Sequence, residues 1–170
     1  MIILGLGSNL SSSFGDRFDN INLAISYLEG YGIHIIKKSS YYETPSYPDE
    51  NNPKFINIIV DVKTELPPVD LASVLLFIEE KLERKRKKKN DPRTCDIDII
   101  DYNSQNLKFN YKELNFNVPH EKLSFRSFVL IPLQEIYHDW KHPKTNEHIT
   151  LLISKLSAKD KKSIFKIKKP

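Results

Sequence analysis

The feature that most constrains the fold of this chain is the run from Phe55 to Lys63, in which isoleucine and valine recur at every second position. β-Branched residues are favoured in strands, where side chains two residues apart point to the same face. One face of this strand is apolar throughout, whereas the other carries Phe55, Asn57 and Asp61. We therefore expect a sheet that packs its apolar face against helices and keeps a more polar second face.

Two amphipathic helices are expected to supply that packing. Each shows apolar side chains spaced three and four residues apart, which is typical of a helix with one buried face. Gly30 and Gly32 end the first helix, and Pro67-Pro68 opens the second, because proline is tolerated in the first helical turn. The apolar stripes comprise Phe14, Phe18, Ile21, Ile25 and Leu28 in the first helix and Leu71, Val74, Leu75, Ile78 and Leu82 in the second.

The order of the elements predicts the fold class. Further strands are expected at residues 2–6, 33–42 and 96–100. The resulting βαββαβ order matches the ferredoxin-like split, an α+β fold with an antiparallel sheet and helices on one face, followed here by a helical C-terminal extension. We expect one domain over residues 1–170, with a lysine-rich tail from residue 155 held loosely at the surface.

Composition places the chain among ordinary soluble globular proteins. Of its 170 residues, 39% are hydrophobic and 28% are charged, which suits one domain with a sizeable core. The net charge of +4 favours anionic partners, either nucleotides or nucleic acid. The single cysteine cannot form an internal disulfide, and we expect neither a signal peptide nor a membrane span. We expect a cytoplasmic monomer without membrane contact.

The chemistry of the chain is concentrated around Asp96 and Asp98, which lie two positions apart on an expected strand. Their carboxylates project to one face about 6–7 Å apart and repel each other by roughly 2–3 kcal/mol at an effective dielectric near 20. A shared hard cation is the commonest reason for such a pair, and the neighbouring Arg93 carries a guanidinium suited to phosphate. These groups favour phosphoryl chemistry. The alternative is a polar strand face with both acids in water.

A basic segment, residues 84–91, leads directly into this strand. It is either a solvated connection or a lid that closes over a bound polyphosphate. The chain has no G-x-x-x-x-G-K-[ST] motif, so a nucleotide here does not bind in a P-loop. In the expected fold, the open face of the sheet carries Phe55, Asn57, Asp96 and Asp98 together. The site is expected there.

Short motifs are spread along the chain from residue 3 to about residue 136. They are Gly7-Ser8-Asn9, Tyr42-Glu43-Thr44-Pro45, Phe55-Ile56-Asn57, Arg84-Lys85-Arg86, Pro92-Arg93-Thr94-Cys95-Asp96-Ile97-Asp98, Val118-Pro119-His120 and Arg126-Ser127-Phe128. In order and spacing, this set resembles the 6-hydroxymethyl-7,8-dihydropterin pyrophosphokinases of folate synthesis. The block around Asp96 and Asp98, with Val-Pro-His downstream, is its most specific part.

The resemblance implies a reaction and a catalytic group. The reaction transfers the terminal diphosphate of ATP to the hydroxymethyl group of the pterin and releases AMP. Asp96 and Asp98 are expected to hold two magnesium ions that bridge the ATP phosphates. Asp96 would also approach the hydroxymethyl group, and Asp98 would accept its proton. Arg84 and Arg93 complete the implied catalytic group.

The resemblance also implies two sets of binding residues. The pterin ring is expected between Phe55 and Phe128, with Asn57 and the backbone near residues 44–47 reading its polar edge. The implied pterin contacts are Thr44, Pro45, Tyr47, Phe55, Asn57, Asp96 and Phe128. The implied ATP contacts are Glu79, Arg84, Arg86, Arg93, Ile99, Asn117, His120 and Arg126.

The chain departs from the family pattern at three places. Asn90-Asp91 stands where the family commonly has Trp-Gly, so closure of the basic segment must depend on something other than that tryptophan. Leu76 stands where a glutamine is common, which puts one adenosine contact in doubt. Glu121 replaces a frequent aromatic residue. None of these positions belongs to the expected metal pair.

Two other functions fit parts of the sequence. An RNA-binding ferredoxin-like domain would use the positive charge and the aromatic residues of the sheet face, but the aromatic-rich RNP1 pattern is absent and the two acids repel phosphate without a metal. A magnesium-dependent phosphohydrolase would use water in place of the pterin alcohol. We expect small-molecule substrates and no nucleic-acid partner.

Overall fold

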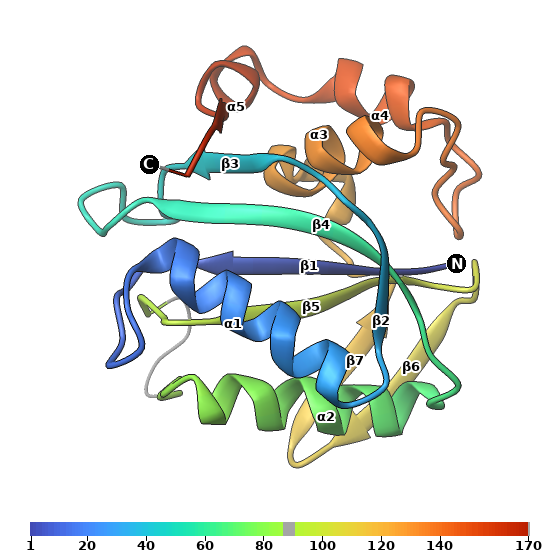
Figure 1. Ribbon diagram of the computed structural model, residues 1–170. Helices are drawn as coiled ribbons and strands as arrows, with labels where there is room; N and C mark the ends of the chain where they lie inside the picture. The colour runs from blue at the N-terminus through green and yellow to red at the C-terminus, as the bar shows by residue number, and fades with distance from the viewer. Residues whose placement is uncertain (87–90, 170) are drawn as a thin grey trace.

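A twisted antiparallel sheet forms the centre of the molecule in the computed structural model, which describes residues 1–86 and 91–169 (Figure 1). The strand order is β5-β1-β4-β3-β8, and β2 also pairs with β4. The expected mixed α+β architecture with an antiparallel sheet is therefore confirmed. The strands are β1 (Ile2–Ser8), β2 (His34–Lys38), β3 (Tyr41–Thr44), β4 (Phe55–Lys63), β5 (Asp96–Tyr102) and β8 (Phe165–Ile167).

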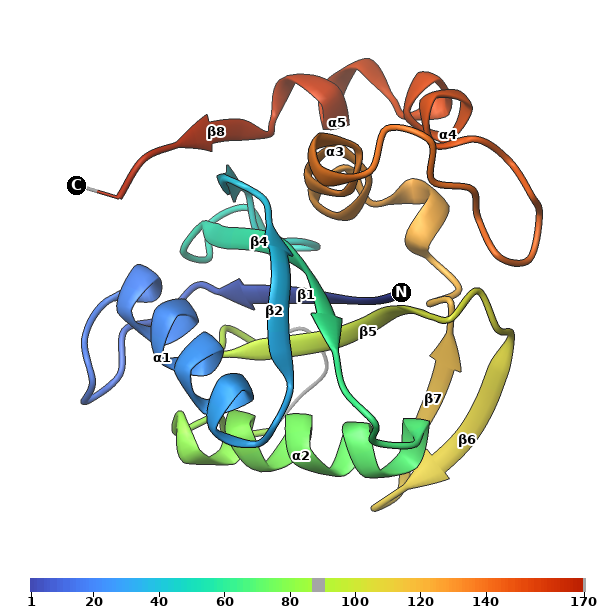
Figure 2. The ribbon, with the colours of Figure 1, turned by 45° about the vertical axis from the view of Figure 1, so that its right-hand side comes forward.

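The first face of the sheet is covered by α1 (Arg17–Gly30) and α2 (Pro68–Lys81), which lie side by side beneath it (Figures 1 and 2). Asp16 caps α1 by accepting hydrogen bonds from two backbone N–H groups of the first turn, while proline opens α2. The alternating isoleucines and valines of β4 pack into this core, as predicted. Phe14 is an exception to the predicted stripe, because it precedes the helix and is exposed.

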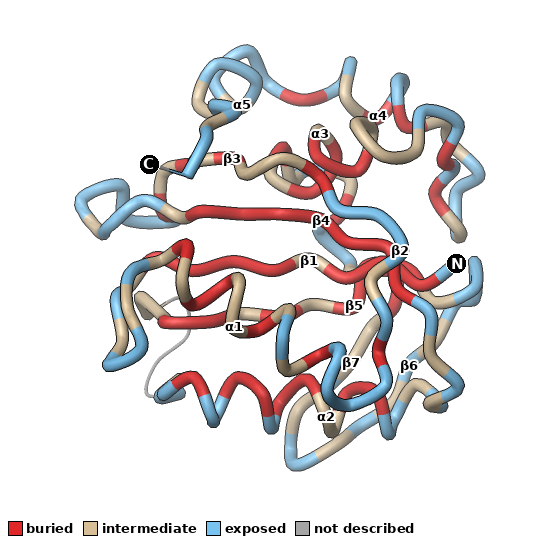
Figure 3. The backbone as a smooth tube through the Cα atoms, in the orientation of Figure 1, coloured by how far each residue is buried: buried red, intermediate tan, exposed pale blue. Residues whose placement is uncertain are grey.

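The second face is half covered, which corrects the expectation of helices on one face only. The C-terminal helices α3 (Ser127–Ile136) and α4 (Ile149–Lys155) pack on it, preceded by a short 3₁₀ helix at Leu123–Phe125. They bury a second core around Ile3, Ile59 and Ile100. Figure 3 shows the buried strands between these two helical layers. The uncovered half of this face is left for a site.

Gly7 keeps part of the floor of that open half clear, whereas a Cβ atom at Gly5 would meet Ile59 and Ile100 of the second core at 3.4 Å. In the sheet register, Gly7 lies between Asn57 of β4 and Asp96 of β5, and Gly5 pairs with Asp98. A Cβ atom at residue 7 would lie 3.0 Å from Oδ1 of Asn57 and 3.5 Å from the Phe55 ring. The Gly-x-Gly of β1 thus serves close packing on the sheet face and is not a dinucleotide fingerprint.

The C-terminal part adds a hairpin and an edge strand. The hairpin comprises β6 (Leu107–Tyr111) and β7 (Leu114–Val118), which form a separate two-stranded sheet below β5. The expected loose tail is wrong for the described residues up to 169, because α5 (Ala158–Lys162) leads into β8, which pairs with the edge strand β3. No helix in the described part of the chain is long and apolar enough to cross a membrane.

Candidate active site

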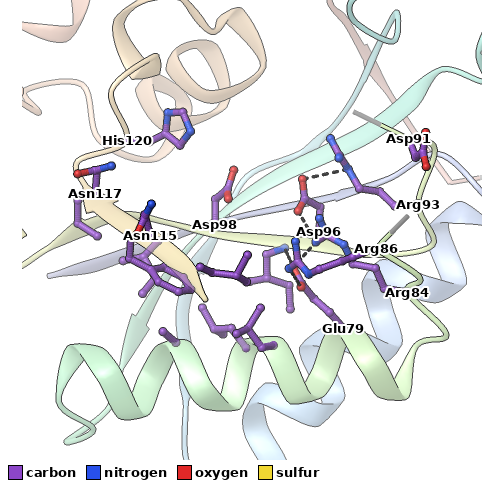
Figure 4. Close-up of a pocket in the computed structure, with 18 of the residues that line it drawn as sticks. Glu79, Arg84, Arg86, Asp91, Arg93, Asp96, Asp98, Asn115, Asn117 and His120 are labelled. Carbon is purple, nitrogen blue, oxygen red and sulfur yellow. Dashed lines mark hydrogen bonds and ion pairs between the residues drawn. The ribbon is translucent and has the colours of Figure 1, made fainter. Parts of the chain in front are cut away.

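A cleft of about 550 Å³ opens between the uncovered sheet face, the end of α2 and the β6–β7 hairpin (Figure 4). One side is apolar and is formed largely by side chains of α2, β5 and β7. The other side carries acids, arginines and a histidine that converge from distant parts of the chain. The apolar lining comprises Ala72, Leu75, Leu76, Ile97, Ile99, Leu114, Phe116 and Val118, and the charged lining includes Glu79, Arg84, Arg86, Arg93, Asp96, Asp98, His120 and Arg126.

Asp96 and Asp98 share one face of β5, as the alternation of the strand predicted. Their side chains are 23% and 42% exposed, whereas Ile97 and Ile99 are buried in the core on the opposite face. In Figure 4 both carboxylates project from β5 into the cleft. The alternation of β5 thus places the acids on one face and the isoleucines on the other, where Ile97 and Ile99 contribute both to the core and to the apolar side of the cleft.

Arginines surround the first carboxylate. Asp96 pairs with Arg84, and its Oδ2 lies 3.1 Å from Nε of Arg93, an ion pair whose geometry is too poor for a hydrogen bond. Burial alone would raise the pKa of Asp96, but the guanidinium groups of Arg84 and Arg93 outweigh that effect and lower it. Asp96 is therefore ionised at neutral pH.

The second carboxylate has less positive charge around it. Asp98 accepts one hydrogen bond from Nη1 of Arg126 at 3.2 Å, and Nη2 of that arginine lies 3.2 Å from Nε2 of His120. Burial and the charge of Asp96 raise the pKa of Asp98 despite the pairing with Arg126. Burial and the nearby Arg126 lower the pKa of His120, so this histidine is neutral at pH 7. Asp98 thus has one guanidinium partner, whereas Asp96 has two.

Glu79 forms the buried end of the charged network. Its carboxylate pairs with both Arg84 and Arg86 and accepts a hydrogen bond from the N–H of Ile97 at 2.7 Å. Burial, together with the charge of Asp96, raises the pKa of Glu79 to about 7. Arg84 therefore lies between two acids, one inside the protein and one on the cleft wall. This arrangement fixes its guanidinium toward the cleft.

The donor set suits magnesium completed by phosphate oxygens. Within residues 1–86 and 91–169, no group of three or more His, Cys, Asp or Glu side chains gathers as a metal site. Mg²⁺ is usually bound by one or two carboxylates plus substrate phosphates and water. The pair of acids on β5, whose side chains are both partly exposed to the cleft, fits that pattern. Asp96 and Asp98 are thus the residues that would hold the metal.

Two aromatic rings flank the charged residues, each with an arginine over it. The Arg93 guanidinium lies 5.1 Å from the centre of the Phe55 ring, and that of Arg126 lies 5.4 Å from the Phe128 ring. Such guanidinium–ring contacts are favourable in partly buried sites. Each arginine therefore links one ring to one aspartate. A flat ligand held by these rings would lie against the carboxylate pair.

The predicted binding residues gather to different extents. The implied ATP contacts all line the cleft, including Ile99 and Asn117. On the pterin side, Asn57 donates a hydrogen bond to Oγ1 of Thr44 at 2.9 Å, next to Phe55. Of the implied pterin contacts, Asp96 lines the cleft, and the others lie outside its lining: Thr44, Pro45, Tyr47, Phe55, Asn57 and Phe128. Tyr47 is 81% exposed. The backbone readout expected there stays a prediction.

Some features of the site were not predicted. The hairpin residues Leu114 and Phe116 line the cleft, although no motif or period in the sequence pointed to them. Asn9 connects several loops around the site, and the sequence showed it only as part of a motif. Of the expected lid, residues 84–86 and 91 are described, whereas residues 87–90, including Asn90, lie outside the described residues.

Comparisons with known proteins agree on one family. The family model for 7,8-dihydro-6-hydroxymethylpterin-pyrophosphokinase matches residues 3–138. A 2-amino-4-hydroxy-6-hydroxymethyldihydropteridine pyrophosphokinase of Synechocystis is 35% identical over 92% of this chain and 76% of its own length. The enzyme of the same name from Bacillus subtilis is 36% identical over 78% of this chain and 75% of its own. The fold resembles Plasmodium falciparum HPPK-DHPS with pteroate (TM-score 0.72, 17% identity), covering 91% of this chain and 44% of that one.

Proposed function

The chain belongs to the 7,8-dihydro-6-hydroxymethylpterin-pyrophosphokinase family, and from this we propose how its cleft performs the reaction. The protein transfers a diphosphate from ATP to the hydroxymethyl group of 6-hydroxymethyl-7,8-dihydropterin in folate synthesis. The hydroxymethyl oxygen attacks the β-phosphorus, the bond from that phosphorus to the α–β bridging oxygen breaks, and AMP leaves. The observation that supports this assignment most strongly is the Asp96–Asp98 pair set among cleft arginines.

ATP is placed along the length of the cleft. Its base fits the apolar side, beside Ile99 and Asn117, where the wall around Leu76 and Phe116 offers flat apolar surface. Its phosphates lie toward the cationic side, where guanidinium groups bind phosphate oxygens in pairs. The phosphate contacts proposed are Arg84, Arg86, Arg93, His120 and Arg126, with Glu79 orienting the first two.

The pterin is placed between Phe55 and Phe128. Support comes from the position of both rings beside an arginine–aspartate pair, which brings the exocyclic carbon of a stacked pterin near the acids. Asn57 and Thr44 supply an amide and a hydroxyl for the polar edge of the ring. We retain Pro45 and Tyr47 as backbone contacts, which requires the loop after β3 to move toward the cleft.

The residues contribute positioning and charge rather than covalent chemistry. Two bound magnesium ions, held by Asp96 and Asp98, would neutralise the phosphate charge that builds up during transfer. Asp98 accepts the proton of the hydroxymethyl group, a role that its raised pKa supports. Arg84 and Arg93 stabilise the charge on the transferred group. Alignment of two substrates in one cleft supplies much of the remaining rate.

Further properties are proposed on structural grounds. The strand order β5-β1-β4-β3, all antiparallel, supports the ferredoxin-like class with the second strand of that fold split into β2 and β3. The buried, unpaired thiol of Cys95 is compatible with a reducing cytoplasm. We keep the expectation of a monomer. The RNA-binding and phosphohydrolase alternatives receive no support from the comparisons.

The test of the proposed function is an analysis of products. The protein is incubated with ATP and magnesium, with and without 6-hydroxymethyl-7,8-dihydropterin, and the nucleotides are separated by chromatography. We expect AMP and a pterin diphosphate only when both substrates are present. Formation of ADP or free phosphate without the pterin would instead indicate a hydrolase.

A further inference from the structure

Asn9, which immediately follows β1, is a buried amide with an unusual set of partners. The residue is 2% exposed, and its side chain bonds to segments 37, 44 and 84 positions away in the sequence. In Figure 1 the end of β1, the loop between β3 and β4, and the start of β5 all lie at the left-hand end of the sheet. Asn9 is the point at which these three segments are joined.

One half of the amide holds the loop at residues 45–54. Nδ2 of Asn9 donates to Oγ of Ser46 at 3.2 Å and to the carbonyl of Pro53 at 3.0 Å. Ser46 donates to the same carbonyl at 2.5 Å, so both ends of the loop meet at this amide. This loop begins after Thr44 and ends before Phe55, two residues assigned to the pterin.

The other half holds the backbone of Arg93. Oδ1 of Asn9 accepts the N–H of Arg93 at 2.6 Å, and the N–H of Asn9 donates to the carbonyl of Arg93 at 3.0 Å. The carbonyl also accepts the N–H of Leu10 at 3.2 Å. Arg93 is thus fixed on both sides of its Cα, while its guanidinium lies between Asp96 and the Phe55 ring.

We propose that Asn9 is a positioning residue that couples the pterin half of the site to the phosphate half. The inference rests on the proposed function and adds a residue to it. The amide suits this role because it offers two donors to the loop and one acceptor to Arg93 in a fixed plane. A shift of the loop on pterin binding is transmitted to Arg93, and a shift of Arg93 on phosphate binding is transmitted to the loop. By linkage, each ligand then strengthens the binding of the other by the same factor.

A second buried amide offers a matched control. Asn20 of α1 is fully buried and bonds to the carbonyl of Leu10 at 2.9 Å and to Oγ of Ser12 at 2.6 Å. Its side-chain bonds reach neither the residue 45–54 loop nor Arg93. Loss of either amide leaves buried polar groups unpaired and destabilises the fold. We expect the coupling between pterin binding and nucleotide binding to be lost when Asn9 is replaced and to be kept when Asn20 is replaced.

The experiment compares wild type, Asn9→Ala and Asn20→Ala by calorimetry. The Kd of the pterin is measured with and without magnesium and α,β-methylene-ATP, a non-transferring analogue, and the ratio of the two values is the coupling factor. For wild type we expect a factor in the range of about 5- to 150-fold that is usual for coupled sites. Asn9→Ala should lower it at least about fivefold, toward no coupling. Asn20→Ala should keep it.

Three outcomes would overturn the inference: a wild-type factor of one, an unchanged factor in Asn9→Ala, or an equal loss in Asn20→Ala. Asn9→Asp is the second variant if the alanine variant fails to fold. It keeps the acceptor for Arg93 but loses the donors to the loop, so it should also lose the coupling.

Hydrogen exchange separates failure of this inference from failure of the proposed function. A wild-type protein that binds no pterin in either condition contradicts the proposed function. In that case, hydrogen exchange measured without ligands still tests whether Asn9 links the loop to Arg93. Asn9→Ala should speed exchange both at the Arg93 amide and within residues 46–54, and Asn20→Ala should do neither. Faster exchange in only one of the two segments would overturn the coupling.

Discussion

At the scale of single residues, the two aspartates of β5 share a face but differ in their surroundings. Asp96 lies between Arg84 and Arg93, whereas Asp98 has one partner, Arg126. The pKa of Asp96 is lowered by its arginines, and that of Asp98 is raised by burial and by Asp96. The fold therefore favours the negative charge of Asp96 and disfavours that of Asp98.

Asp96→Asn and Asp98→Asn should lower turnover to a similar extent. Their effects on the thermal stability of the free protein should be opposite in sign. Both variants should lose about 100- to 1000-fold in kcat, the usual effect of removing one transition-state charge partner. In metal-free buffer at pH 7, Asp98→Asn should raise the melting temperature because it removes a disfavoured charge, and Asp96→Asn should lower it. Calorimetric melting and steady-state rates test both statements. Near-wild-type turnover of either variant with magnesium would contradict the metal assignment.

Alanine substitutions of two phenylalanines should distinguish the proposed pterin site from the proposed ATP site. Phe128→Ala removes one face of the proposed stack and should weaken pterin binding by about tenfold, with a smaller effect on ATP. Phe116, on the hairpin wall of the cleft, is the matched variant, and Phe116→Ala should weaken ATP binding more than pterin binding. Titration of each ligand separately measures both. Equal losses for both ligands in Phe128→Ala would contradict the stacking assignment.

His142 should make the stability of the free protein depend on pH. Burial lowers the pKa of this histidine, whose Nδ1 accepts the N–H groups of Lys144 and Thr145 at 3.1 and 3.3 Å. The unfolded chain therefore binds a proton more readily, so the free energy of unfolding should fall as the pH drops below about 6.5. Melting between pH 8 and 5 for wild type and His142→Asn tests this, because asparagine keeps an acceptor without titrating. An equal pH dependence in both proteins would exclude His142 as its source.

At the scale of elements, the C-terminal strand β8 is paired with β3, which leads into the proposed pterin contacts. β8 pairs with β3 from Tyr41 to Glu43, just before the residue 45–54 loop. Lys166 pairs with Glu135 at 3.0 Å, and Lys159 of α5 reaches Glu50 within that loop at 2.6 Å. These contacts lie beyond residue 138, where the family match ends. The tail therefore supports the edge of the sheet from which the loop departs.

Removing residues 157–170 should loosen that edge. We expect faster hydrogen exchange in β3 and a higher KM for the pterin, with little change in the KM for ATP, because the cleft proposed to bind ATP lies on the β5 side of the sheet. Lys159→Ala is the control: an exposed ion pair contributes only about 0–1 kcal/mol, so its effect should be small. Unchanged exchange in β3 after the truncation would show that the strand does not support the edge.

The sequence predicted those elements whose side chains alternate or recur with a clear period. β4, β5 and the two helices under the sheet follow from such patterns. The strand β8 does not, because its pairing depends on backbone hydrogen bonds and its side chains are mostly exposed lysine and phenylalanine. The sequence also did not predict that the C-terminal helices pack on the second face of the sheet. An apolar stripe shows that a helix is buried on one side, but it does not show which face of a sheet the helix covers.

At the scale of the whole molecule, the position of the site follows from incomplete coverage of the sheet. α3 and α4 cover one half of the second face, and Gly7 of β1 leaves space beside Asn57 and Phe55 on the other half. The acids and aromatic residues were predictable on that half because strand alternation fixes their face. Asn9 and Arg84 lie in segments without a regular secondary structure, so no periodic pattern in the sequence predicts where their side chains lie. Their bonding partners are known only from the structure.

The central claim is that β- and γ-phosphates move together from ATP to the pterin alcohol in this cleft. ATP labelled with ³²P at the β-position tests it most directly, with wild type and Asp96→Asn assayed in parallel in magnesium. We expect wild type to carry the label into the pterin product and to form AMP in equal amount, and we expect Asp96→Asn to transfer almost none. Label recovered in ADP, or in free phosphate or diphosphate while the pterin stays unlabelled, would contradict diphosphate transfer to the pterin.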